Sequence, residues 1–168
     1  NLTWSKDNQR ILFSANRTNN WEYEPRESDI WAVDVFGETA GIMHQITNHA
    51  GGEYNPQVSP DGKRLAFIHN DDKKLAYRNR YLHVMDLPKF TMGSAVNQQM
   101  KPSSASKSLT ADIDNSVSNL RWDDKSNGLY YQMLERGMIN IGYTSISGKH
   151  KTVASGLGGT TLGRPYAF

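Results

Sequence analysis

The chain has 168 residues, and its formal net charge of +2 arises from 19 basic and 17 acidic side chains. Apolar residues make up 37% and aromatic residues 10%, which is typical of a folded domain and excludes a disordered chain. So small an excess of positive charge argues against a nucleic-acid partner. No stretch approaches the roughly 18 consecutive apolar residues of a membrane helix, so we expect no membrane span.

The first predicted unit begins with a strand and a polar turn. Residues 4–10 form this turn around Asp7, and the apolar run 11–13 follows it. Turn residues followed by β-favouring residues are typical of a hairpin. Further strands are predicted at residues 30–35 and 45–47, so the unit has four strands.

The same order of elements returns twice along the chain. A Ser-Pro-Asp-Gly turn at residues 59–62 precedes the apolar run 65–68, and a polar turn at residues 123–127 precedes the run 129–131. Pro and Gly set the dihedral angles of such turns. One longer and one short strand follow each hairpin, at residues 81–87 and 108–110 and at residues 139–143 and 152–154. The equivalent positions before the turns are Trp4, Val58 and Trp122.

A unit of four short strands cannot bury both of its faces alone, so similar units must stack around an axis. We therefore predict an all-β fold, a partial β-propeller of about three four-stranded antiparallel blades. The blades are expected at about residues 1–53, 54–116 and 117–163, with a further inner strand beginning at 164–168. Propellers have about four to eight blades, so we expect a piece of a longer protein. A compact β-sandwich is the alternative.

The chain offers few candidates for catalysis or metal binding. It has no cysteine, which excludes disulfides, thiolate catalysis and sulfur-ligated metals. There is no Gly-x-Ser-x-Gly elbow, and the glycine-rich residues 156–161 lack the Lys and the helix of a phosphate-binding loop. The histidines have no metal-binding spacing and are predicted to be structural or exposed: His44, His49, His69, His83 and His150. We expect no catalytic residue, metal or cofactor.

Acidic side chains recur at corresponding positions of the three units. Asp7, Asp61 and Asp124 lie in the turns, and Asp34 and Asp86 lie near the ends of corresponding strands. Repetition favours an architectural role, so these carboxylates are predicted to cap turns and not to catalyse.

The loop between the second and third strands of the first unit has the most distinctive chemistry. It combines aromatic rings with carboxylates, which suits a cationic group or a peptide amine. The candidate substrate-binding residues are Trp21, Glu22, Tyr23, Glu24 and Arg26. The alternative is a solvated loop whose aromatic rings pack on the neighbouring blade.

Over nearly its whole length the chain resembles the propeller of the prolyl oligopeptidase family of serine peptidases, most closely the acylaminoacyl-peptidase branch. The resemblance is carried by residues 11–17, 21–26, 28–31, 59–64 and 162–166. It implies a non-catalytic propeller that guides peptide substrates to an α/β-hydrolase domain with a Ser-Asp-His triad. That domain is missing here, and no triad residue maps onto this chain. The turns around Asp7 and Asp124 depart from Ser-Pro-Asp-Gly.

A second resemblance, to TolB, implies a protein-binding module instead. The expected partners are the missing hydrolase domain, the remaining blades and a peptide substrate. Uncovered blade faces also predict self-association. The composition does not choose between periplasm and cytoplasm, and the resemblances favour the periplasm.

Overall fold

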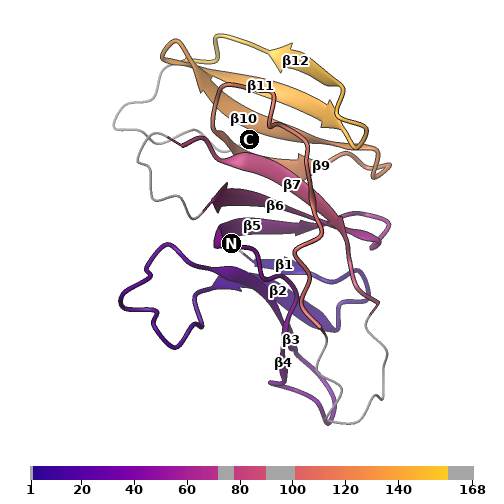
Figure 1. Cartoon of the computed structure of the whole chain (residues 1–168). Coiled ribbons are helices and arrows are strands. Elements are labelled where there is room, and N and C mark those ends of the chain that lie inside the picture. The colour runs from indigo at the N-terminus through magenta and orange to yellow at the C-terminus, as the bar shows by residue number, and fades with distance from the viewer. Residues whose placement is uncertain (1, 72–77, 90–100, 159–168) are drawn as a thin grey trace.

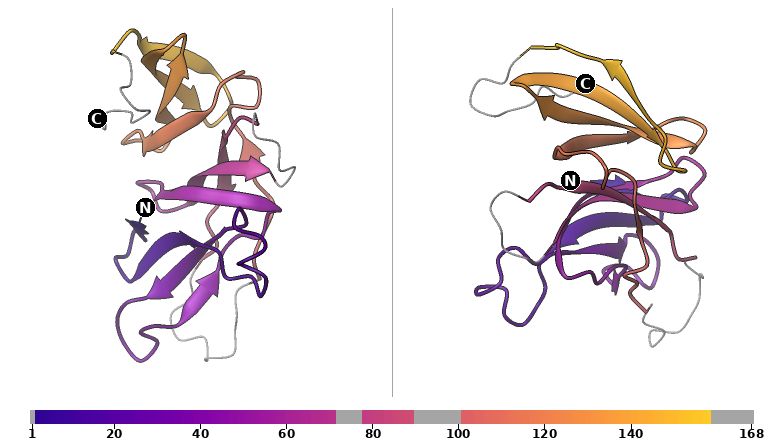
Figure 2. Two further views of the ribbon diagram at one scale, coloured as in Figure 1. Left: turned by 90° about the vertical axis from the view of Figure 1, so that its left-hand side faces the viewer. Right: turned by 45° about the horizontal axis from the view of Figure 1, so that its top comes forward.

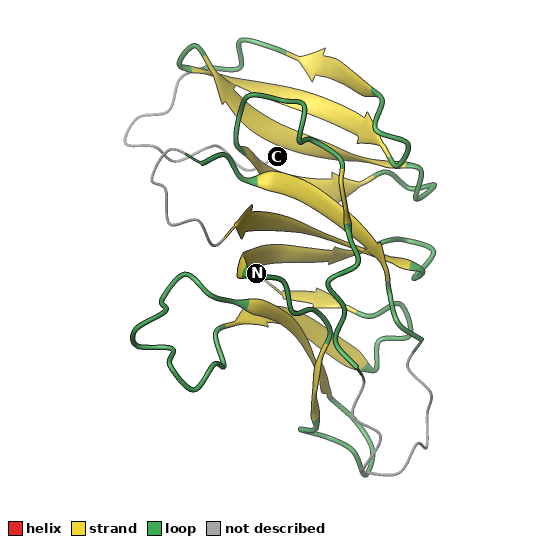
Figure 3. Cartoon of the chain, viewed as in Figure 1, coloured by secondary structure: helices red, strands yellow, loops and turns green. Residues whose placement is uncertain are grey.

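The computed structural model describes residues 2–71, 78–89 and 101–158. This part of the chain forms three four-stranded antiparallel sheets that follow one another along the molecule (Figures 1 and 2). The described residues form no helix (Figure 3), and so none that could cross a membrane. The predicted all-β fold of three four-stranded blades is therefore confirmed, and the two-sheet sandwich is wrong.

Each sheet is one blade, with its strands paired in chain order. The first blade contains β1 (Leu2–Trp4), β2 (Arg10–Ala15), β3 (Asp29–Asp34) and β4 (Met43–Gln45). The second contains β5 (Gly51–Val58), β6 (Arg64–Asp71), β7 (Tyr81–Asp86) and β8 (Lys107–Ser108). The third contains β9 (Val117–Trp122), β10 (Gly128–Glu135), β11 (Met138–Ser145) and β12 (His150–Ala154). The further inner strand predicted at residues 164–168 lies outside the described residues.

Strand register aligns the three blades with one another. The pairs at the beginning of β2, β6 and β10 are equivalent, namely Arg10 with Asp34, Arg64 with Asp86, and Gly128 with Ser145. Counting from these pairs, Phe13 of the first blade corresponds to Phe67 of the second, and Trp31 corresponds to His83.

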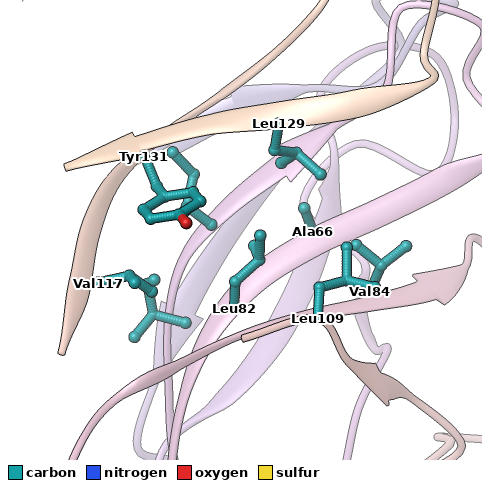
Figure 4. Close-up of a cluster of buried hydrophobic side chains, with 9 residues drawn as sticks. Ala66, Leu82, Val84, Leu109, Val117, Leu129 and Tyr131 are labelled. Atoms are coloured by element: carbon teal, nitrogen blue, oxygen red, sulfur yellow. The ribbon is translucent and has the colours of Figure 1, made fainter. Parts of the chain in front are cut away.

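Each blade has two faces, because successive side chains of a strand point to opposite sides. We call the face towards the preceding blade the leading face and the opposite one the trailing face. The core between the first and second blades contains Leu12, Ile30, Ala32, Ile46, Leu65, Phe67 and Met85. The core between the second and third blades (Figure 4) contains Ala66, Ile68, Leu82, Val84, Leu109, Val117, Leu120, Leu129 and Tyr131. Each buried side chain of this size contributes roughly 1.5–3 kcal/mol, so the junctions hold the blades together.

All three turns before the second strand of a blade share one backbone geometry, although their sequences differ. The fourth turn residue has a positive φ in each copy, 56° at Asn8, 74° at Gly62 and 58° at Ser126. Gly and Asn tolerate this left-handed region best. At Gly62 an added Cβ would also come within 2.8 Å of Lys6 Cβ of the first blade, so the glycine allows adjacent turns to pack closely.

Carboxylates cap these turns, but not all of the predicted ones do. Asp7 Oδ1 accepts hydrogen bonds from Ser5 Oγ (2.5 Å) and Gln9 N (3.1 Å). Asp61 makes the equivalent contacts, and the hydrogen bond from the Ser59 hydroxyl lowers the pKa of its carboxyl.

In the third turn the predicted cap is wrong. Asp123 Oδ1, and not the exposed Asp124, accepts from Lys125 N (3.1 Å) and Asn127 N (2.8 Å). Asp123 occupies the serine position of the other two turns, and its carboxylate accepts the main-chain bonds that close this turn.

The aspartates at the ends of β3 and β7 also differ from one another. Asp34 is buried, and its carboxylate lies 2.5 Å from Arg10 Nε across the strand pair. Asp86, at the equivalent position, is exposed. The carboxylate of Asp34 therefore serves a buried ion pair, which stabilises the sheet only while both partners are present.

Candidate functional site

The connection between β2 and β3, residues 16–28, is a loop that is closed upon itself by hydrogen bonds. Asn16 Nδ2 donates to Glu24 O (2.8 Å), which ties the beginning of the loop to its far side. Within the loop, Trp21 N donates to Thr18 O (3.3 Å) and Glu24 N donates to Asn20 O (3.0 Å). Successive turns therefore fix the backbone that carries the candidate residues.

The base of this loop is attached to the innermost strand of the second blade. Gly51 N donates to Glu27 Oε2 (2.9 Å), Ser28 Oγ donates to Glu53 O (3.0 Å), and Tyr54 hydroxyl donates to Arg26 O (3.2 Å). The loop thus spans the junction between two blades, and its position depends on both of them.

All five candidate binding residues are exposed on this one loop, which projects from the first blade (Figure 1): Trp21, Glu22, Tyr23, Glu24 and Arg26. Trp21 is 58% exposed and Tyr23 85% exposed, so neither ring is buried against the part of the chain that the structure describes. Exposed rings offer a flat apolar or cation-binding surface, and the carboxylates beside them suit an amine.

A second cluster, which the sequence reasoning missed, lies between the first and second blades. The ring centroids of His49 and His69 are 5.2 Å apart, and those of His69 and His83 are 4.9 Å apart. His69 lies on β6 and His83 on β7, whereas His49 lies in the connection before β5. The sequence could have indicated this cluster through the predicted pairing of β6 with β7, because that pairing places Phe67 opposite His83.

Polar groups link these imidazoles to a buried carboxylate. Ser106 Oγ lies 2.8 Å from His49 Nε2 and 2.9 Å from His83 Nδ1. His49 Nδ1 contacts Glu53 Oε1, and Thr47 Oγ1 donates to Glu53 Oε2. We call the five residues His49, Glu53, His69, His83 and Ser106 the histidine junction.

Burial lowers the pKa of two imidazoles of the histidine junction. Burial, together with the imidazoles of His69 and His49, lowers the pKa of His83 to about 4. Burial and His49 also lower the pKa of His69. Nearby, burial and the charge of Glu53 raise the pKa of Asp29 to about 6. His69 and His83 are therefore neutral at pH 7 and donate or accept hydrogen bonds as uncharged rings.

Ser106, His49 and Glu53 follow the order of nucleophile, base and acid in a hydrolytic triad. The Ser106 hydroxyl, however, is held between two imidazoles, which engage both its proton and its oxygen. Glu53 is completely buried, and Ile30 N also donates to it (3.3 Å). Hydrogen bonds of this kind rigidify a buried polar network, so the carboxylate of Glu53 and the Ser106 hydroxyl have structural roles at the junction. In the residues that the structure describes, no group of three or more His, Asp or Glu side chains is arranged to hold a metal ion.

Comparison with known proteins places this fold among propellers. No family model matches the chain. Dipeptidyl-peptidase 5 of Porphyromonas gingivalis is 23% identical over 158 residues, a match that covers 92% of this chain and 21% of that protein. The structure of TolB from Acinetobacter baumannii matches with a TM-score of 0.64 and 18% identity, covering 94% of this chain and 32% of that one.

A puromycin-hydrolyzing peptidase of Mycobacterium tuberculosis matches with a TM-score of 0.65 and 15% identity, covering 90% of this chain and 21% of that one. The resemblance to peptidase propellers and to TolB is therefore confirmed at the level of the fold. The chain spans only about a fifth to a third of the length of these proteins.

Proposed function

We propose that this chain forms one side of the propeller of a serine peptidase, and that it restricts and guides the peptides that reach a hydrolase domain outside these residues. The observation that carries the proposal is the loop of residues 16–28. It exposes two aromatic rings beside carboxylates, and hydrogen bonds to two blades hold it in place. The similarity to Dipeptidyl-peptidase 5 supports a peptidase as the whole protein.

In this proposal the loop holds the amino terminus of a peptide. Trp21 and Tyr23 contact apolar parts of the peptide, and the carboxylates of Glu22 and Glu24 bind its α-ammonium group. Charge-assisted hydrogen bonds of this kind are about twice as strong as neutral ones. In this proposal the nucleophile lies outside these residues, so we expect the chain to show no hydrolysis of a chromogenic peptide ester that persists at constant specific activity through repurification.

The test compares the peptide Ala-Pro-Ala-Phe with its N-acetylated form by amide chemical-shift perturbation. We expect weak binding, with a dissociation constant of about 1 mM, and several-fold tighter binding of the free amine. The double change Glu22→Gln and Glu24→Gln should abolish that preference, and Trp21→Ala with Tyr23→Ala should weaken both peptides about tenfold.

Phe36→Ala is the matched control for this test. Phe36 is also an exposed aromatic residue of the first blade, but it lies in the β3–β4 connection at the opposite end of the strands. It should leave both affinities unchanged. Equal affinity for the two peptides would show that the carboxylates do not bind the α-amine. A loss of affinity in Phe36→Ala as large as that in Trp21→Ala with Tyr23→Ala would show that the loop is not the binding site.

The second candidate is a protein-binding module, which the structural similarity to TolB favours. The same exposed loop would then contact a folded partner instead of a peptide terminus. The acetylation experiment separates the two, because a protein-binding surface has no reason to prefer a free α-amine.

A further inference from the structure

The loop of residues 16–28 ends at Ser28, which is fixed to strand β5 of the second blade. Ser28 is buried and pairs with β5 in parallel: its N donates to Gly51 O (3.3 Å), and Glu53 N donates to its O (2.9 Å). Buried main-chain bonds are costly to break, because the freed groups lose their partners away from water. Ser28 therefore belongs to the fold, and the position of the loop is decided by contacts of the residues before it.

One side chain of β5 reaches further along the loop than the strand pairing does, namely that of Tyr54. Its hydroxyl donates to Arg26 O (3.2 Å), two residues before Ser28. Its ring lies over Gly52, where an added Cβ would overlap both the ring and the hydroxyl. Tyr54 is 36% exposed, so the ring does not serve to fill a core. The absence of a side chain at Gly52 thus lets Tyr54 lie along β5 and hold the loop at Arg26.

The short segment around Pro25 is held on both of its sides. Asn16 Nδ2, at the beginning of the loop, donates to Glu24 O (2.8 Å), and the Tyr54 hydroxyl donates to Arg26 O. Pro25 lies between these two carbonyls, and its ring fixes its φ at about −65°. A segment with so little freedom keeps the Glu24 carboxylate at a defined place as long as both hydrogen bonds are made.

We propose that Tyr54 is a positioning residue of the peptide site: by holding the Arg26 carbonyl, it keeps the Glu24 carboxylate where the α-ammonium group of a peptide binds. This inference rests on the proposed peptide-binding function of the loop. Tyr54 contacts the main chain of the loop and acts on the peptide through Glu24. Such preorganisation raises affinity, because the carboxylate is ordered before the peptide arrives.

The aromatic part of the loop does not depend on Tyr54 in this way. Tyr23 N donates to Asn20 O (2.9 Å) and Trp21 N donates to Thr18 O (3.3 Å), so local turns hold these two residues. Loss of the Tyr54 hydroxyl should therefore weaken the contact with the α-ammonium group and spare the contacts of the two rings. This difference separates a positioning role from a general loss of structure, which would weaken both kinds of contact.

The test is Tyr54→Phe, which removes only the hydroxyl and keeps the ring over Gly52. The peptides are Ala-Pro-Ala-Phe and its N-acetylated form, followed by amide chemical-shift perturbation, and each variant is checked for native circular dichroism. The variant should bind the free amine about threefold more weakly than the unaltered chain does, which is within the range expected for one hydrogen bond. The acetylated peptide has no ammonium group, and its affinity should be unchanged.

A second measurement needs no peptide. The Gly51 amide donates to the Glu27 carboxylate, next to the carbonyl that Tyr54 holds, so its hydrogen exchange reports whether the loop is docked on β5. In Tyr54→Phe this amide should exchange about fivefold faster. The Glu53 amide, which donates to the buried Ser28, should keep its rate.

Gly52→Ala changes the same contact from the other side, because the added methyl group displaces the Tyr54 ring. It should lower the preference for the free amine at least as far as Tyr54→Phe does. The double variant should bind no more weakly than Gly52→Ala alone, because both changes act on one hydrogen bond. Tyr143→Phe is the matched control: that hydroxyl donates to Asp123 Oδ2 (2.8 Å) in the third blade, so its loss should change neither the two affinities nor the exchange of Gly51.

Two outcomes would overturn the proposal. If Tyr54→Phe weakened the free and the acetylated peptide by the same factor, Tyr54 would have a structural role only. If neither affinity changed, Tyr54 would not position the carboxylate, whatever the exchange rate of Gly51. A failure of the proposed function gives a different result: the unaltered chain itself would show no preference for the free amine, while the exchange measurement would still decide whether Tyr54 holds the loop.

Discussion

The leading faces of the first and second blades have the same residue pattern and opposite surroundings. Phe13 and Phe67 occupy the same register position, but Phe67 is completely buried under the first blade whereas Phe13 is only partly covered. The apolar pattern of a blade therefore follows from the repeat. Whether a face is covered depends on a neighbour that the pattern of the blade itself does not reveal.

The largest expected effect comes from truncating these two phenylalanines. Phe67→Ala removes a ring from a closed core and should lower the free energy of unfolding by roughly 3–5 kcal/mol. Phe13→Ala should cost only about 1 kcal/mol, because the ring is only partly covered. Urea unfolding followed by circular dichroism measures both. Equal losses would mean that the first blade's leading face is as closed as that of the second.

The next effect concerns His83, which stands on the covered face where the open face has Trp31. The pKa of His83 in the folded chain is about 4, below the ordinary value of 6.5. Its neutral form is therefore favoured by folding, so its contribution to stability is complete above pH 6.5 and is lost as the pH falls towards 4. We expect a loss on the order of 2 kcal/mol over that range, after allowance for the ring's partial exposure.

His83→Gln should flatten this pH dependence, because glutamine does not titrate but can still donate to Ser106 Oγ. Asp29 acts in the opposite direction: its raised pKa of about 6 makes its contribution more favourable as the pH falls from 6 towards 4. The matched control is His150→Gln, since His150 lies in the third blade and contacts Asp112 at 3.1 Å. A profile of His83→Gln as steep as that of the unaltered chain would assign the acid transition to other groups.

Local sequence signals predicted the strands and turns well, and they failed where the arrangement depends on residues far apart in the sequence. The turn around Asp61 and the apolar alternation in β2, β3 and β6 are local, so a four-stranded unit could be recognised from them. The histidine junction takes its residues from β5, β6, β7 and the connections before β5 and β8, and only the folded second blade brings these distant parts of the sequence together. The exposure of Trp21 was equally hidden, since an aromatic loop has the same composition whether it packs on a blade or projects from it.

The three turns before β2, β6 and β10 differ from the two leading faces in this respect: their sequences differ, but their backbone geometry is the same. In the third turn Asp123 replaces both the serine and the aspartate of the other two, and its Oδ2 also accepts from the Tyr143 hydroxyl (2.8 Å). Asp123→Ala should therefore cost about 1–2 kcal/mol, whereas Asp124→Ala should stay within about 0.5 kcal/mol.

The pKa of Tyr143 offers a second measurement, because a general loss of stability would not change it. Burial, followed by the hydrogen bond to Asp123 and its charge, raises the pKa of Tyr143 to about 12. In Asp123→Ala the tyrosine should titrate closer to its ordinary pKa of about 10, as measured by ultraviolet absorbance, and in Asp124→Ala it should not shift. If Asp124→Ala instead lowered the pKa and the stability, the cap would lie where the repeated aspartates of the sequence first indicated. Asp123, which occupies the serine position of the other two turns, would then not cap the turn of this blade.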